Sequence, residues 1–292
     1  MSAPLPTRPN HRLRNERLVL LVIGLVLAYA GWRTFMFRSA LTDAIVHGWR
    51  VDYTGLVDQI GGFRRVCPGT GKWTDGVTCL SVPNSDHIEE LPNALLQLDP
   101  RRLRVVDASS FRDLSVLKAL SRIEWLDIGN ATNLTDIEAL KSLRSLRFLR
   151  IEGCPHITNV DVLKHLPSLE VLRLEGFTNL TSLDAIKGFG KLNELWLIGC
   201  TSLQNVDPLG SLPTLEAVHI RQCTGLGNVD ALKNLPSIEL LSLVGCTGLT
   251  QVDNLRRLRT LKRVWLIGCT GLPKQSVLAL QAALPKTDVI KP

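Results

Sequence analysis

Aliphatic residues recur along most of this chain in a unit of 23 residues. Each unit begins with two apolar residues separated by one position, and this spacing places both side chains on one face of a short β-strand. Apolar residues then follow at every third position, which favours a 3₁₀ or loosely helical return. The apolar pair occurs nine times in succession, at Leu80/Val82, Leu103/Val105, Leu126/Ile128, Leu149/Ile151, Leu172/Leu174, Leu195/Leu197, Val218/Ile220, Leu241/Leu243 and Val264/Leu266.

A single unit of this size cannot bury its own apolar side, so the units must stack on one another. Stacking turns each repeated apolar position into a continuous row, with the strands side by side in a parallel sheet. We therefore expect residues 80–292 to form an α/β solenoid, with a parallel sheet on its concave face and helical or 3₁₀ returns on its convex face. The segment from Ser276 to Ile290 departs from the pattern, and we expect it to form a helix and a last strand that cap the core.

The consensus of the unit is L-x-x-L-x-L-x-G-C-T-x-L, and it is clearest in the segments LNELWLIGCTSL, IELLSLVGCTGL and LKRVWLIGCTGL. On these motifs, over about 210 residues, the chain resembles the leucine-rich-repeat family, in the short-repeat class of internalin-like and phosphatase-regulator solenoids. In that family an asparagine or cysteine at the cysteine position turns inward and hydrogen-bonds the backbone where it bends. The resemblance implies this structural role for Cys154, Cys200, Cys223, Cys246 and Cys269.

A metal site is the alternative interpretation of these cysteines. Stacked units would hold equivalent residues in a line about 5 Å apart, whereas a metal ion needs ligands that converge on one point. Parallel side-chain directions also disfavour disulfide bonds between neighbouring units. Ala131 and Phe177 stand at the same position in two other units, so a thiol is not required there. We therefore expect no metal site and no cofactor.

The N-terminal pattern is different, because residues 18–32 are uncharged throughout and follow a basic stretch. As a helix these residues would be roughly 22 Å long at about 1.5 Å per residue. Crossing the ~30 Å hydrocarbon core of a membrane therefore needs an extension to Phe37. We expect a basic cytoplasmic tail at residues 1–17 and one transmembrane helix at residues 18–37, as in a single-pass membrane protein.

Two other interpretations of residues 18–37 stay open. A cleaved signal peptide competes, since Ala28-Tyr29-Ala30 fits a signal-peptidase site, and a buried helix of a soluble domain is disfavoured because the segment has no polar face. For a retained anchor, the preceding arginines favour a cytoplasmic N-terminus and a periplasmic or extracellular repeat domain, although Arg33 and Arg38 weaken that orientation. The same N-terminal arginines supply much of the net charge of +7, so this charge does not by itself indicate a nucleic-acid partner.

Residues 38–79 are expected to form a stalk and an N-terminal cap. They contain Cys67 and Cys79, which stand outside the repeated cysteine position. A disulfide bond between them would staple the cap and would fit an oxidising compartment. Two unpaired buried thiols are the alternative.

The residues before, between and after each apolar pair are expected to point away from the core, onto the concave face. In the middle units arginines alternate with Glu152 and Glu175, and a solvated sheet face explains such a charge ladder equally well. Later units place aromatic and aliphatic residues on this face, which is typical of a site that binds a partner. In the alternative interpretation, the C-terminal helix or residues 38–78 of the same chain cover these residues. The candidate partner-binding residues are Trp196, Ile198, His219, Arg221, Leu240, Val244, Trp265, Ile267, Arg150 and Arg173.

No catalytic motif accompanies this surface. The chain has no phosphate-binding loop, no G-x-S-x-G and no H-E-x-x-H, and its six histidines are scattered. Glutamates in the same rows as the arginines would repel phosphate, which argues against nucleic acid. We therefore expect a membrane-anchored module that binds a protein partner and has no catalytic residue and no small-molecule substrate. A structural subunit or scaffold of a cell-envelope membrane complex is the alternative.

Overall fold

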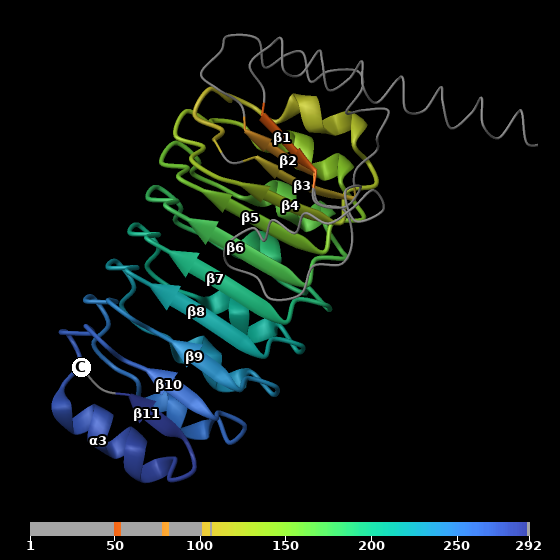
Figure 1. Ribbon diagram of the computed structural model, residues 1–292. Coiled ribbons are helices and arrows are strands. Elements are labelled where there is room, and N and C mark those ends of the chain that lie inside the picture. The colour runs from red at the N-terminus through yellow and green to blue at the C-terminus, as the bar shows by residue number, and fades with distance from the viewer. Residues whose placement is uncertain (1–49, 54–77, 82–100, 106, 291–292) are drawn as a thin grey trace, which may run out of the picture.

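The computed structural model of this chain describes residues 50–53, 78–81, 101–105 and 107–290. These residues form one sheet whose eleven strands follow one another in chain order (Figure 1). The strands are β1 (Arg50–Tyr53), β2 (Thr78–Ser81), β3 (Arg102–Val105), β4 (Trp125–Ile128), β5 (Phe148–Glu152), β6 (Val171–Glu175), β7 (Glu194–Ile198), β8 (Ala217–Arg221), β9 (Leu240–Ser242), β10 (Arg263–Trp265) and β11 (Asp288–Ile290).

A short helix lies in most of the connections between consecutive strands, on the opposite side of the sheet from the viewer in Figure 1. The predicted 3₁₀ returns are confirmed, and one α-helix follows them near the C-terminus. The helices are η2 (Ser115–Ala119), η3 (Glu138–Ser142), η4 (Asp161–His165), η5 (Asp184–Ile186), η6 (Asp207–Ser211), η7 (Asp230–Asn234), η8 (Asp253–Arg257) and α3 (Lys274–Ala283).

The core lies between the sheet and the row of 3₁₀ helices. It receives the apolar pairs of the strands, and Leu172, Leu195 and Val218 on adjacent strands are all fully buried. The returns contribute the apolar residues at every third position, such as Leu209 and Leu232. Because alternate strand residues point the same way, the pairs form aliphatic rows that run through the stack. The solenoid predicted from the spacing is therefore confirmed.

The 23-residue register is confirmed from β3 to β10, as where Leu195 in β7 pairs with Val218 in β8. The first pairing differs, because Leu80 in β2 pairs with Val105 and not with Leu103. A shift of two residues leaves the same side chains on the same face of a strand, so the apolar alternation cannot distinguish the two registers. β1 adds an antiparallel strand beside β2, which the repeat pattern does not predict.

The cap predicted at the C-terminal end is confirmed. Helix α3 packs against η8 and buries Val277 and Leu280 in the core, while β11 pairs in parallel with β10. These contacts cover the apolar end that the last repeat would otherwise expose to water. They also place α3 on the core side of the sheet, so the interpretation in which this helix covers the concave face is wrong.

The five repeated cysteines are all buried, and none of them forms a disulfide bond. The Sγ atom of Cys223 donates to the carbonyl oxygen of Leu197 at 3.6 Å, and that of Cys246 donates to Ile220 at 3.4 Å. Cys200 reaches the carbonyl oxygen of Leu174 in the same way, at 3.8 Å. These three thiols therefore each bind the strand of the preceding unit, which is the role that the resemblance implies. Among the described residues, no group of potential ligands is arranged to hold a metal ion.

Several predictions fall on residues outside the described part of the chain, namely the basic tail at 1–17, the anchor at 18–37 and most of the stalk and cap at 38–79. Cys67 lies there as well, so the disulfide bond between Cys67 and Cys79 stays a prediction. Within the described ranges, no helix combines the length and the apolar character that a membrane span requires.

Candidate binding surface

The side chains before, between and after each apolar pair lie on one side of the sheet from β3 to β10, and we call this side the open sheet face. Strand pairing aligns them in rows across the stack. In the middle row Trp196 pairs with His219, His219 with Ser242, and Ser242 with Trp265. The two tryptophans therefore face the same way, with strands β8 and β9 between them, as the equal spacing predicts.

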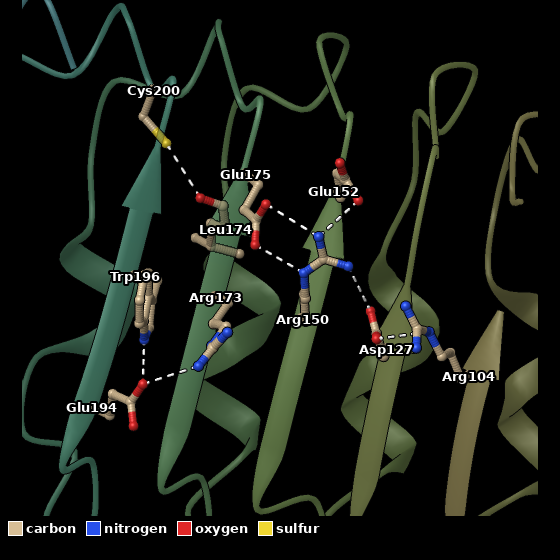
Figure 2. A network of polar contacts seen from close by, with 10 residues as sticks. All are labelled: Arg104, Asp127, Arg150, Glu152, Arg173, Leu174, Glu175, Glu194, Trp196 and Cys200. Carbon is tan, nitrogen blue, oxygen red and sulfur yellow. Dashed lines mark hydrogen bonds and ion pairs between the residues drawn. The ribbon is translucent and has the colours of Figure 1, made fainter. Parts of the chain in front are cut away.

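The N-terminal half of the open sheet face is an ion-pair network centred on Arg150 (Figure 2). The guanidinium of Arg150 donates to Glu175 at 2.8 Å, to Glu152 at 2.8 Å and to Asp127 at 3.0 Å, and Asp127 also pairs with Arg104 at 3.2 Å. Partial burial alone would lower the pKa of Arg150, but the hydrogen bonds to Glu175 and Asp127 outweigh it and raise this pKa.

The network changes how the arginine candidates are interpreted. Every nitrogen of the Arg150 guanidinium already donates to a carboxylate of the chain, so Arg150 holds the three strands β4, β5 and β6 together. Asp127, which is buried, accepts from Arg150 and also pairs with Arg104, although it is not among the candidate residues predicted from the sequence. The sequence spacing could have identified Asp127 as a partner of both arginines, because it stands 23 residues after Arg104 and 23 before Arg150 in the same row.

The middle of the face is a stack of rings and guanidinium groups around Trp196. The His219 ring lies parallel to the Trp196 ring, with centroids 3.6 Å apart. The guanidinium carbon atoms of Arg173 and Arg221 lie 4.3 Å and 5.1 Å from the Trp196 ring centre, which is cation–π geometry. Glu194 accepts hydrogen bonds from Arg173 and from Nε1 of Trp196 (Figure 2). Trp196 is thus held rigidly in a polar stack and is not an isolated apolar anchor.

The C-terminal half of the face is mainly apolar. Ile267 is 44% exposed, and the remaining apolar candidates in this half are partly buried. The Trp265 ring lies 5.3 Å from the guanidinium carbon of Arg263, whose charge is matched by Asp288. The apolar candidates that the fold gathers here are Ile198, Leu240, Val244, Trp265 and Ile267.

His219 is a neutral part of the stack. It is only 8% exposed, and burial together with the positive charge of Arg221 lowers its pKa from 6.5 to about 4. Its ring therefore carries no charge at neutral pH, and its Nδ1 atom is buried without a hydrogen-bond partner among the described residues. A neutral imidazole can accept one hydrogen bond and donate one, so the hydrogen-bonding capacity of this buried atom is unused within the described residues.

We expect an NMR titration of the histidine ring protons to show His219 protonating with a pKa of about 4. The unfolded chain takes up this proton near pH 6.5, so His219 makes the folded state less stable as the pH falls from about 6.5 to about 4. Replacing Arg221 with glutamine should raise the pKa of His219, because one of the charges that opposes protonation is removed. A pKa of His219 that stays at its ordinary value of 6.5 in the folded protein would contradict the burial of its ring.

No protein-family model matches the chain, and no curated protein matches it either. Among solved structures, it is similar to the leucine-rich-repeat domain of the type III effector XopL, with a TM-score of 0.51 and 21% identity over 72% of this chain and 86% of that one. It is also similar to internalin C2 from Listeria monocytogenes, with a TM-score of 0.40 and 23% identity over 54% of this chain and 77% of that one. Together with the stacked 23-residue units, the likeness to the XopL domain shows that the repeats of this chain have the fold of a leucine-rich-repeat solenoid.

Proposed function

We propose that this chain is a protein-binding module that captures its partner on the open sheet face. The observation that supports this most strongly is the composition of the face from β7 to β10, where Trp196 and Trp265 lie in one row among partly exposed aliphatic residues. A sheet face that only meets water is normally polar, and tryptophan is enriched among the residues that contribute most to binding. The contacts of Trp196 with His219, Arg173 and Arg221 would limit the side-chain entropy lost on binding.

We further propose that residues 18–37 anchor the chain in a membrane, with the N-terminus in the cytoplasm and the repeats on the other side. The support is the uncharged run of residues 18–32 behind a basic tail. An anchored module of this kind would hold a partner at the membrane surface.

The test is capture of the partner by the full chain, with cross-linking, identification of the captured protein and measurement of its affinity after purification. Replacing Trp196 and Trp265 together with alanine is expected to weaken binding by at least about tenfold, because both side chains are large contact residues of the same row. The matched control is Leu278→Ala on α3, an apolar side chain that is 52% exposed away from this face.

Circular dichroism must show that the double variant is still folded. Undiminished capture by this variant would contradict the proposed function. If capture is instead lost only when residues 1–78 are deleted, the chain acts as a structural subunit held through its N-terminal segment.

A further inference from the structure

Among the described residues, most charged side chains of the open sheet face are matched by an opposite charge, and Arg221 is an exception. Arg221 makes no ion pair with a carboxylate among the described residues, and its guanidinium carbon lies 5.1 Å from the centre of the Trp196 ring. The Nε atom of Arg221 is buried and has no hydrogen-bond partner among the residues that the structure describes. The matched arginines are Arg104 with Asp127, Arg150 with Asp127, Glu152 and Glu175, Arg173 with Glu194, and Arg263 with Asp288.

Two more buried polar atoms have no hydrogen-bond partner among the described residues, one on the strand of Arg221 and one on the next strand. They are Nδ1 of His219, on the same strand as Arg221, and Oγ of Ser242, which pairs with His219 across β8 and β9. The two residues are 8% and 0% exposed, so neither is freely hydrated. Buried polar groups normally have a hydrogen-bond partner, and a cluster that lacks one is a place where a ligand can supply it.

We propose that Arg221, His219 and Ser242 form a subsite for a single carboxylate, supplied by an aspartate or glutamate side chain of the bound protein; this inference rests on the proposed function. A carboxylate is an acceptor with room for several hydrogen bonds. The subsite offers it Nε–H of Arg221, the hydroxyl of Ser242 and Nδ1–H of His219 in the tautomer that carries the proton there. The positive charge of Arg221 makes its hydrogen bond a charge-assisted one.

The surroundings favour a carboxylate over a phosphate group. A phosphate carries close to two negative charges at neutral pH, and the subsite contains one unmatched positive charge, since Glu194 already neutralises Arg173. The side chains beside Arg221 are apolar, with Ile198 as its strand partner and Val244 in the next unit. The ligand segment that fits is therefore an acidic residue with apolar neighbours.

The test uses a display library of random peptides selected on the full chain. Selected peptides are expected to share an aspartate or glutamate between apolar residues. Changing that acid to its amide should weaken binding by about tenfold, and Arg221→Gln should weaken binding of the original peptide by a similar factor. The two changes together should cost no more than either alone, because they remove the same interaction. Arg144→Gln, the same substitution on an exposed loop before β5, is the control and should have no effect.

The inference is overturned if the two changes are additive, if the selected peptides share no acidic residue, or if a phosphoserine in place of the acid binds more tightly. In each of these cases the proposed function still stands, provided that Trp196→Ala with Trp265→Ala abolishes peptide binding. Selected peptides that bind this double variant undiminished would overturn the proposed function itself, and the subsite with it.

Discussion

Replacing Leu195 with alanine is expected to lower the free energy of unfolding by about 2–5 kcal/mol. Leu195 is fully buried in β7, and its strand partners Leu172 and Val218 are fully buried as well. The substitution would leave a cavity inside a continuous aliphatic row, between two units that cannot close up without changing the strand spacing. The loss therefore combines the transfer free energy of the missing atoms with the cost of the cavity.

Urea unfolding followed by circular dichroism measures this effect. The control is Ile198→Ala in the same strand, whose side chain lies on the open sheet face and is partly exposed, so its loss should cost less than about 1 kcal/mol. Similar losses of unfolding free energy for both variants would contradict the burial pattern of β7, in which Leu195 faces the core and Ile198 lies on the open sheet face. Each unit in the stack is stabilised by its interfaces with its neighbours, so Leu195→Ala is also expected to make unfolding less cooperative.

Replacing Arg150 with methionine is expected to lower the free energy of unfolding by about 1–3 kcal/mol. Arg150→Met removes the cation that joins Asp127, Glu152 and Glu175, and among the described residues it leaves the buried Asp127 with Arg104 alone. The side chains of Asp127 and Glu175 are only 8% and 18% exposed, so water replaces the lost hydrogen bonds poorly. Partial exposure of the network keeps the loss below that of a fully buried ion pair.

Arg147→Met is the matched control for this variant. Arg147 makes a two-pronged pair with Glu170 at 2.9 Å, but its side chain is 57% exposed, so the loss should not exceed about 1 kcal/mol. The comparison uses the same urea titration. An equal loss at both positions would contradict the structural role assigned to Arg150. Partner binding should survive Arg150→Met, because the donors of Arg150 are already used within the chain.

The spacing of apolar residues predicts the main features of the fold because the physics of a repeat is local. A side chain two positions along a strand points to the same side, and a unit that cannot bury itself must stack on its neighbours. The strand rows, the 3₁₀ returns and the C-terminal cap were all predicted for this reason, whereas the role of the inward thiols was implied by the family resemblance. The rows of the open sheet face, including the alignment of Trp196 with Trp265, were predicted in the same way.

The chemistry of that face depends on distances that the spacing does not contain. Arg150 and Arg221 occupy equivalent faces of their strands, yet Arg150 is saturated by three carboxylates while Arg221 meets none among the described residues. The register of β2 against β3 is also decided only in three dimensions. Periodicity determines which way a side chain points, whereas its charge, hydration and freedom to bind depend on the neighbours that folding brings from other units.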